Sequence, residues 1–236
     1  PPTPNRSSLN SGSYIDLRLG QRTMGGAMTI EFNITFFGYF NFYQSLFDCA
    51  NGINEEDRFV LQNFLDTTYP LLSFTVKHGN ATNAGVPSTV LTYTAWPALY
   101  VPYHLVVTVS ETNTAAYLDG VLVGSFLNGW TPVLTTRSNC YIGKSNKESA
   151  DDAYLSALVS SLKIYSGAMT QADVTAAFGV PTVSPTASPT ASPTASPTTA
   201  PTSAPTQELG NLVDFTSLLV VREDDAYTGV STVLLT

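Results

Sequence analysis

Residues 104–110 read HLVVTVS, and they are followed by AAYLDG at 115–120, GVLVGSF at 120–126, NCYIG at 139–143 and VSSLKIY at 159–165. Each run is short, rich in β-branched or aromatic residues, and bounded by Gly, Asn, Asp or Ser, as the strands of an antiparallel sheet are. The pair Asp119-Gly120 separates two apolar runs, and a type I′ hairpin needs positive φ at both central positions. We therefore expect Tyr117-Leu118 to pair with Val121-Leu122 across a tight turn.

These runs, in this order, resemble the laminin-G-like (LamG), pentraxin-like branch of the concanavalin A-like lectin and glucanase superfamily. The resemblance rests on HLVVTV at 104–109, YLDGVLVG at 117–124, YIGKSN at 141–146 and LKIYSGAMT at 162–170, preceded by MTIEFNITF at 28–36 and SLFDCANG at 45–52. It covers residues 12–178 and implies an all-β, antiparallel jelly-roll β-sandwich. Such sandwiches include lectins, adhesion modules, structural proteins and glycosidases, so function must be argued from particular residues.

Composition excludes two classes of partner. The 236 residues carry a formal net charge of −8, and only 12% of them are charged. Nucleic acids and anionic membrane surfaces are bound through clustered Lys and Arg, so neither is an expected partner. No apolar run approaches the length of a membrane span, and we expect no membrane insertion. Because the chain starts on Pro-Pro-Thr-Pro and stops on VSTVLLT, we expect a fragment of a longer protein or a processed protein.

Four segments follow from changes in composition. We expect a lead-in linker at 1–12, the LamG-like sandwich at 13–179, a Ser/Pro/Thr linker at 180–206, and the start of a further β segment at 207–236. Within the sandwich, DRFVLQNF at 57–64 and LLSFTVKHG at 71–79 are predicted strands, and 81–89 is a predicted exposed loop. Thr170, with Asp173 three residues later, predicts a capping box for a short helix that closes the domain.

The linker repeats Ser-Pro-Thr-Ala with no charge. Such a segment cannot bury enough apolar surface to offset its ordering entropy, and its prolines favour extended polyproline II. Repeats of this kind indicate an O-glycosylated stalk, with candidate sites at Ser184, Thr186, Ser188, Thr190, Ser192, Thr194, Ser196 and Thr198.

The runs LVDF, LLVV and STVLL beyond the linker are too few for an independent core. They must pair with the sandwich, with the continuing chain, or with a neighbouring copy. The linker is long enough to carry them past their own domain, and an exposed sheet edge accepts an added strand. We therefore predict self-association, or pairing with a neighbouring domain, through the strands at 209–236.

Two features have both a structural and a functional interpretation. The aromatic-rich run at 36–47 suits core packing better than a sugar-stacking platform. His104 opens an apolar strand and, in the resembled family, occupies a structural position. A hydrogen-bonded core histidine is therefore favoured over a base or a ligand.

No catalytic pattern is present. Retaining glycosidases need two carboxylates about 5 Å apart, and the β-glucanase branch of the resembled superfamily presents them as Glu-x-Asp-x-x-Glu on one strand. Here Glu55-Glu56-Asp57 is followed by Arg58, and the remaining acids are scattered. There is no nucleophile elbow, phosphate-binding loop or zinc-spaced His/Cys cluster. We expect no enzyme activity.

A calcium site is the more credible chemistry, because hard oxygen ligands could come from two acidic loops, at 51–57 and 144–152. The resemblance to pentraxin-like proteins carries the ligand positions over to Asp57, Asn146, Asp151 and Asp152. The lysines of the second loop weaken this case. A calcium site and a solvated loop pair without metal both stay open.

Cys49 and Cys140 are the two cysteines. Each lies beside one of these loops, on strands that the resembled fold would set as neighbours, so a disulfide is favoured over two buried free thiols. Closing so long a loop would stabilise the fold by about 4 kcal/mol in the chain-entropy model.

Three sequons occur, at Asn5, Asn33 and Asn80. Asn33 alternates with apolar Phe32 and Ile34 and should face outward. Together with the stalk, the sequons indicate an extracellular or cell-surface location.

The favoured function is a non-enzymatic structural or adhesion module of a larger, glycosylated cell-surface or filament-forming protein. A calcium-dependent carbohydrate-binding lectin is the alternative, and a glycoside hydrolase the weaker one.

Overall fold

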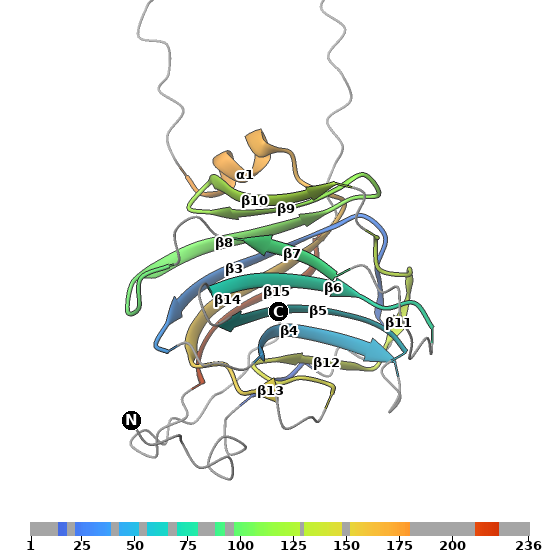
Figure 1. Ribbon diagram of the computed structural model, residues 1–236, viewed down its shortest axis with the longest axis horizontal. Coiled ribbons are helices and arrows are strands. Elements are labelled where there is room, and N and C mark those ends of the chain that lie inside the picture. The colour runs from blue at the N-terminus through green and yellow to red at the C-terminus, as the bar shows by residue number, and fades with distance from the viewer. Residues whose placement is uncertain are drawn as a thin grey trace, which may run out of the picture.

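Two β-sheets pack face to face (Figure 1). The computed structural model describes residues 14–17, 22–38, 43–51, 56–65, 70–79, 88–92, 97–127, 130–147, 152–179 and 211–221. The strand pairs are antiparallel, apart from β13 with β4, which is parallel. The all-β jelly-roll sandwich expected from the sequence is therefore the observed fold class.

The first sheet has seven strands and is called the seven-stranded sheet below. Its order is β1-β12-β4-β5-β6-β7, with β13 also paired to β4. The strands are β1 (Ile15–Asp16), β12 (Asn139–Ile142), β4 (Tyr43–Asn51), β5 (Glu56–Leu65), β6 (Pro70–Val76), β7 (Ser88–Thr92) and β13 (Asp152–Ala153). Because β7 begins at Ser88, the predicted loop at 81–89 is wrong at its last two residues, and 81–87 lie outside the described residues.

The second sheet has six strands and is called the six-stranded sheet, with the order β10-β9-β8-β3-β14-β15. The strands are β10 (Val121–Leu127), β9 (Asn113–Leu118), β8 (Pro102–Val109), β3 (Met28–Phe36), β14 (Ala157–Ser166) and β15 (Asn211–Val221). A separate pair joins β2 (Arg22–Met24) to β11 (Thr135–Arg137).

Alternation along β3 separates the core from the outer face of the six-stranded sheet. Met28, Ile30, Phe32, Ile34 and Phe36 are buried in the core cluster, which also includes aromatic side chains of β4, β5 and β6. The side chains between them, such as Glu31 and Asn33, therefore face away from the core, because successive residues of a strand point to opposite faces. β3 coincides with the run MTIEFNITF at 28–36, which is part of the family resemblance.

The Asp119-Gly120 hairpin is also confirmed. The φ angles are 50° at Asp119 and 77° at Gly120, as a type I′ turn requires. Val121 is opposite Leu118 and Leu122 is opposite Tyr117. A Cβ atom at Gly120 would lie 3.4 Å from the Phe178 ring, so the turn and the end of the following helix are packed closely.

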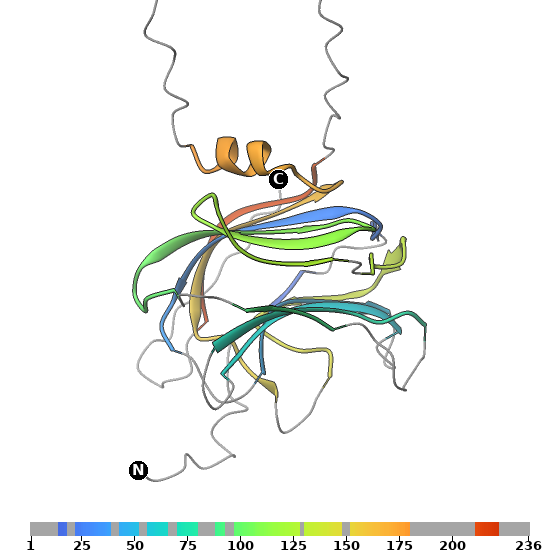
Figure 2. The same cartoon turned by 45° about the horizontal axis from the view of Figure 1, so that its top comes forward.

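Helix α1 (Gln171–Ala177) lies on the outer face of the six-stranded sheet (Figure 2). Its predicted capping box is present, because Thr170 and Asp173 satisfy each other's backbone N–H groups. Val174 packs into a small outer cluster with Val106, Ala115 and Tyr117. The helix therefore covers part of this face. In the described part of the chain, no helix is long and apolar enough to cross a membrane.

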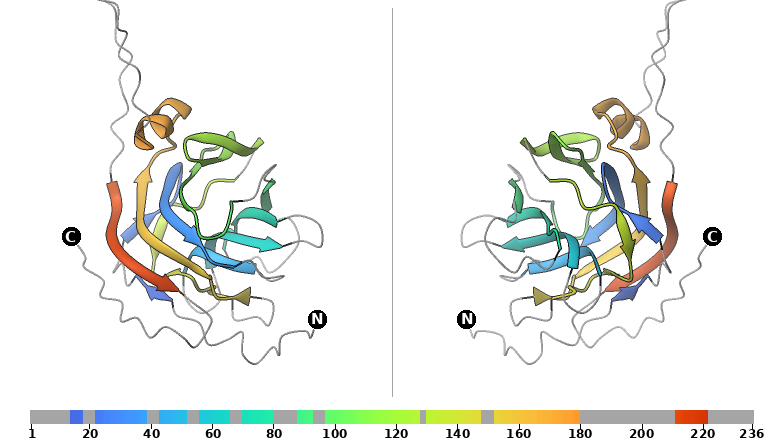
Figure 3. Two further views of the ribbon diagram at one scale, coloured as in Figure 1. Left: turned by 90° about the vertical axis from the view of Figure 1, so that its left-hand side faces the viewer. Right: turned by 90° about the vertical axis from the view of Figure 1, so that its right-hand side faces the viewer.

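The prediction that the segment at 209–236 pairs with a neighbouring copy is wrong for residues 211–221. They form β15, which is antiparallel to β14 of the same chain (Figure 3). Without β15, β14 would be an edge with unpaired backbone groups. A tethered segment of the same chain reaches such an edge at high effective concentration. The strand thus belongs to the sandwich rather than to a further β segment. Residues 180–210, which include the predicted O-glycosylation sites, and residues 222–236 lie outside the described residues.

The predicted disulfide is present. Cys49 and Cys140 are Cα partners on the neighbouring strands β4 and β12, with their Cα atoms 4.1 Å apart. The bond joins positions separated by 91 residues. It fixes β12 to the centre of the seven-stranded sheet, on the same strand pair that carries the adjoining loops.

Arg137 is a buried cation that the sequence did not reveal. Its guanidinium is fully buried and donates to the backbone carbonyls of Met24, Asp57 and Val133, and it lies over the Phe59 ring. Burial lowers the pKa of Arg137 to about 10, although the charge of Asp57 acts in the opposite direction. The side chain therefore joins β2, β5 and the segment before β11 at one end of the sandwich.

The register of β15 gives a direct test, because Lys163 and Asp214 are Cα partners. Opposite residues of an antiparallel pair have Cα atoms about 4.5–5.5 Å apart, within the range that a disulfide can bridge. We expect Lys163→Cys/Asp214→Cys to oxidise within one chain and to remain monomeric in non-reducing electrophoresis. Lys163→Cys/Thr216→Cys, offset by two residues, is the control and should not cross-link efficiently. Disulfide-linked dimers from the first variant would contradict pairing within the chain.

Candidate binding site

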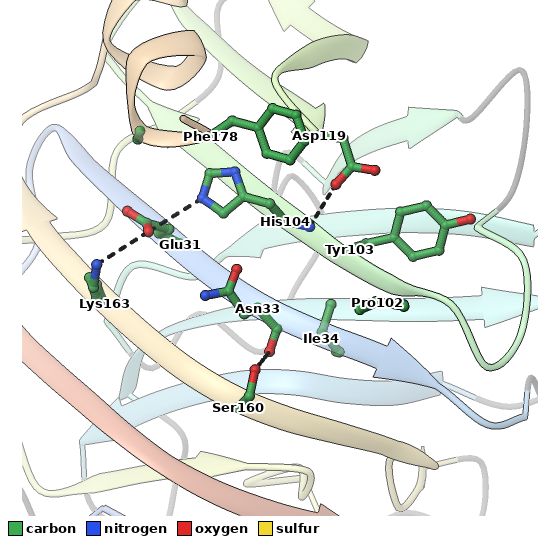
Figure 4. Close-up of a pocket in the computed structure, with 11 residues that line it drawn as sticks. Glu31, Asn33, Ile34, Pro102, Tyr103, His104, Asp119, Ser160, Lys163 and Phe178 are labelled. Atoms are coloured by element: carbon green, nitrogen blue, oxygen red, sulfur yellow. Dashed lines mark hydrogen bonds and ion pairs between the residues drawn. The ribbon is translucent and has the colours of Figure 1, made fainter. Parts of the chain in front are cut away.

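A pocket of about 490 Å³ opens on the outer face of the six-stranded sheet, beside the C-terminal end of α1 (Figure 4). Its lining comes from five places: β3, β8, β14, the Asp119 turn and the end of α1. The lining residues are Glu31, Asn33, Ile34, Pro102, Tyr103, His104, Asp119, Ser160, Lys163, Ala177 and Phe178. Most of them present an amide, carboxylate, hydroxyl, ammonium or aromatic group.

Glu31 is the most buried acid of the pocket, with 4% of its surface exposed. The Tyr165 hydroxyl donates to its Oε2 atom at 2.8 Å, and Lys163 Nζ lies 3.6 Å from Oε1. His104 Nε2 lies 3.3 Å from the same Oε1. These partners come from the two strands that flank β3, so one carboxylate joins three adjacent strands on their outer face.

The environment of Glu31 keeps it ionised. Burial would raise the pKa of its carboxyl group, because the charged form loses hydration. The contact with His104, the hydrogen bond from Tyr165 and the positive charge of Lys163 outweigh burial, and the pKa lies below its ordinary value. At neutral pH, Glu31 is therefore a structural anion rather than a proton donor.

His104 differs in part from its prediction. The side chain is buried, but it lies on the outer face of the sheet rather than in the core between the sheets. Its contact with Glu31 is close without the alignment of a hydrogen bond, and in the described part of the chain neither ring nitrogen has a hydrogen-bond partner. The ring stacks on Phe178, with centroids 5.7 Å apart and planes at 20°. Successive side chains of β8 point to opposite faces of the sheet. Because Leu105 points into the core, its neighbour His104 points outward.

A bulge in β14 shapes the floor of the pocket. The register with β3 shifts between Val159 and Ser161, which leaves Ser160 as an extra residue. Ser160 Oγ donates to the Asn33 carbonyl at 3.2 Å, and Asn33 Nδ2 donates to Ser161 Oγ at 2.7 Å. Two consecutive serines therefore contact Asn33, and Lys163 follows on the same face.

The wall on the helix side is built by the hairpin turn. Asp119 Oδ1 accepts a hydrogen bond from the His104 backbone N–H at 2.8 Å, and Gln171 Nε2 donates to the Gly120 carbonyl at 2.9 Å. Phe178 lies against Gly120 and stays 38% exposed. The pocket thus has an aromatic side and an acidic side next to its polar floor.

The two predicted calcium ligands that the structure describes have different hydrogen-bond partners. Asp57 Oδ1 accepts from the Gly79 backbone N–H at 2.7 Å, whereas Asn146 Nδ2 donates to Asp48 Oδ1 at 2.8 Å. Asp151 and the side chain of Asp152 lie outside the described residues. Among the residues with described positions, no group of three or more His, Cys, Asp or Glu could hold a metal ion. Calcium binding stays a prediction.

Asp48 was not among the predicted ligands, although it lies between the two predicted loops. It is fully buried, and Arg58 Nη2 lies 2.7 Å from its Oδ2 atom. The backbone N–H of Asn146 donates to the same oxygen, and Arg58 also donates to Ser145. A guanidinium and an amide therefore satisfy this carboxylate without a metal.

Two tyrosine rings and a lysine form a cluster beside the seven-stranded sheet. The rings of Tyr14 and Tyr141 meet edge to face at 5.7 Å, and Lys144 Nζ lies 4.8 Å from the Tyr14 centroid. In the predicted aromatic run at 36–47, Phe36 and Phe47 are core residues, as the packing interpretation predicts. Residues 39–42 of that run lie outside the described residues.

Among the predicted sequons, Asn33 is described and is exposed, as expected from its alternation with Phe32 and Ile34. Asn5 and Asn80 lie outside the described residues. The sequence did not single out Glu31, Lys163 or Ser160 as site residues. The available signal was the alternation of polar residues along 29–35 and 161–165, but nothing in it showed that these two strands are neighbours.

The family is shown by comparison with known proteins. The model of the concanavalin A-like lectin/glucanases superfamily matches residues 9–175. This chain belongs to that superfamily. The LamG-like resemblance of the sequence is thereby confirmed. A comparison with curated protein sequences finds no match.

Several solved structures share the fold. An SAP-like pentraxin from Limulus polyphemus has 14% identity and a TM-score of 0.50, over 70% of this chain and 79% of the pentraxin. The carbohydrate-binding module CBM40 of the Ruminococcus gnavus IT-sialidase, bound to α2,3 sialyllactose, has 14% identity and a TM-score of 0.51, over 71% and 93%. The NanB sialidase of Streptococcus pneumoniae has 15% identity and a TM-score of 0.53, over 70% of this chain but 26% of the sialidase. These identities show a common fold.

The Glu31 contacts predict a pH-dependent stability. A folded-state pKa below the ordinary value means that ionised Glu31 stabilises the fold above about pH 4, and that this contribution is lost as the pH falls through the folded-state pKa. We expect Glu31→Gln to lower the free energy of unfolding at pH 7 by about 1–3 kcal/mol. Urea denaturation between pH 7 and pH 3 should show the difference from the wild type shrinking with acidification.

The control for this experiment is Glu111→Gln, which removes an exposed carboxylate from the turn between β8 and β9. It should leave stability within about 0.5 kcal/mol of the wild type at both pH values. A Glu31→Gln variant as stable as Glu111→Gln at pH 7 would contradict the structural role of the buried carboxylate.

Proposed function

We propose that this sandwich is a non-enzymatic, extracellular recognition and adhesion module that binds neutral glycans in the outer-face pocket, within a larger glycosylated cell-surface protein. The observation that carries the proposal is the convergence of polar groups and one exposed aromatic ring on a single open pocket. Ligand sites commonly combine an apolar surface with a few placed polar groups. The superfamily, and a structural neighbour that is a carbohydrate-binding module, support this class of ligand.

The lining suits the hydroxyl groups of a sugar. Hydroxyls both donate and accept hydrogen bonds, so they can pair with amide, hydroxyl, ammonium and carboxylate groups alike. Asn33 and Lys163 provide donors on the floor, and Ser160 Oγ and Asp119 provide acceptors. Phe178 offers an exposed ring for the apolar face of a pyranose.

The charges of the lining favour neutral ligands over acidic ones. Glu31 and Asp119 are acids, and Lys163, the lining ammonium group, lies 3.6 Å from the ionised Glu31. A sialic acid carboxylate would meet two like charges and one cation that is already paired. The net charge of −8 adds a weak repulsion at longer range. Neutral oligosaccharides should therefore bind in preference to sialylated ones.

The same residues support binding without hydrolysis. A glycosidase needs a general acid whose pKa is raised, so that it stays protonated at working pH. The pKa of Glu31 is lowered, and its oxygens already contact His104, Lys163 and Tyr165. Asp119 accepts the backbone N–H of His104 and orders the turn. Both acids thus have structural partners.

The extracellular setting rests on covalent chemistry. The Cys49–Cys140 disulfide is of a kind that persists in oxidising compartments. The sequons and the Ser/Pro/Thr repeats add candidate glycosylation sites of a surface stalk. In this proposal the stalk displays the module, and the pocket supplies adhesion.

A glycan array printed with neutral and sialylated oligosaccharides tests the proposal. We expect the aglycosylated chain to bind neutral structures, and the bound oligosaccharides to be recovered intact by mass spectrometry. Phe178→Ala should abolish the signal because it removes the aromatic wall. Phe126→Ala is the matched control, since both rings are 38% exposed and Phe126 lies on β10, outside the pocket lining.

Thermal denaturation of both variants separates lost binding from lost folding. An array without any glycan signal, or equal signals from Phe178→Ala and the wild type, would refute binding in this pocket. Cleaved oligosaccharides would refute the non-enzymatic role.

A further inference from the structure

The sequon Asn33-Ile34-Thr35 lies in the middle of β3, on the pocket floor. Ile34 takes the inward position and is 1% exposed, so Asn33 and Thr35 belong to the outer face. Asn33 is exposed, and its Nδ2 atom is the atom to which an N-linked glycan is attached. A modification site and a candidate binding pocket therefore share one side chain.

The pocket has the space and the partners for a sugar attached at this atom. It holds about 490 Å³ and is open to solvent beside Asn33. Asn33 Nδ2 donates to Ser161 Oγ at 2.7 Å. A carboxamide nitrogen has two N–H bonds, and glycosylation replaces one of them, so the second can keep this hydrogen bond. Ser160 and Lys163 lie beside Asn33 as partners for the hydroxyls of the first sugar.

We propose that Asn33 carries an N-linked glycan whose first sugar fills the pocket, and that this glycan blocks the binding of an external glycan there. Attachment and filling concern only this chain and its modification. The blocking step rests on the proposed function, because it needs a pocket that binds glycans when Asn33 is unmodified. The pocket would then have two states, set by whether the sequon is occupied during secretion.

The modification is a substitution at C1 of the sugar, and no atom changes its oxidation state. The co-reactant is a lipid-diphosphate-linked oligosaccharide, supplied in the secretory compartment together with its transferase. Asn33 Nδ2 forms a bond to C1 of the terminal sugar, the bond from C1 to the diphosphate oxygen breaks, and the lipid diphosphate leaves. One proton passes from Nδ2 to a base of the transferase. The Cys49–Cys140 disulfide is of a kind that persists in oxidising compartments such as this one, which supports the proposal.

The experiment uses the full chain secreted from eukaryotic cells, with Asn5→Gln and Asn80→Gln in every variant so that Asn33 is the one remaining sequon. In this background, Thr35→Val removes the sequon with a side chain of similar shape, and Thr35→Ser keeps it. Thr35 is not part of the pocket lining. Peptide mass spectrometry measures glycan at Asn33, and the neutral glycan array measures binding.

A third readout reports directly on filling of the pocket. Lys163 is acetylated on the native protein with a small amine-reactive ester, and its rate is compared between variants by peptide mass. We expect the background chain and Thr35→Ser to carry glycan at Asn33, to acetylate Lys163 several times more slowly than Thr35→Val, and to give no array signal. Thr35→Val should carry no glycan and should bind.

The outcomes separate this inference from the proposed function. Unmodified Asn33 in the background chain, or equal Lys163 acetylation with and without glycan, would overturn the inference. Equal and positive array signals from both forms would overturn the blocking step. An array signal absent from both forms, with Lys163 still protected by the glycan, would refute the proposed function while supporting the filled pocket.

Discussion

The ionised Glu31 carboxylate, buried on the outer face of β3, is the constraint on which the described site depends. A buried charge is costly unless it is paired and hydrogen-bonded, and Glu31 meets this need through His104, Lys163 and Tyr165. The partners belong to β8 and β14, the neighbours of β3. Satisfying one carboxylate therefore fixes the lateral order of polar groups across three strands, and those groups become the side of the pocket.

The two faces of the six-stranded sheet have different roles: one forms the core and the other carries the pocket. The inner face is apolar and closes against the seven-stranded sheet. The outer face is covered near Val106 by α1, through Val174, while beyond the end of the helix it stays open. Phe178, at that end, stacks on His104 and packs on Gly120. The helix thus sets the boundary of the pocket as well as protecting an apolar patch.

Sequence patterns predicted those features that depend on neighbouring residues. The period of β3, the positive φ of Asp119 and Gly120, and the Thr170 capping box are local, and each was found as expected. The disulfide was predicted because the family resemblance set its two strands side by side. Features that depend on strand order or register were missed, such as the bulge that brings Ser160 beside Asn33.

The pairing partner of β15 could not be predicted, because a long connection precedes the strand. Residues 178–210 separate α1 from the strand, so sequence alone could not choose among its own sheet, a neighbour or a following domain. The structure assigns the strand to β14, which also moves the free edge of the sheet away from Lys163. The site is therefore flanked by paired strands, and its geometry does not depend on a second chain.

The most direct test of a glycan pocket on this face is a crystal structure. Thr35→Val protein, which cannot be glycosylated at Asn33, would be crystallised with the neutral oligosaccharide that gives the strongest array signal. We expect sugar density between Phe178, Ser160 and Lys163. Density confined to the opposite sheet, beside Tyr141 and Lys144, with the outer-face pocket empty at saturating ligand, would contradict it.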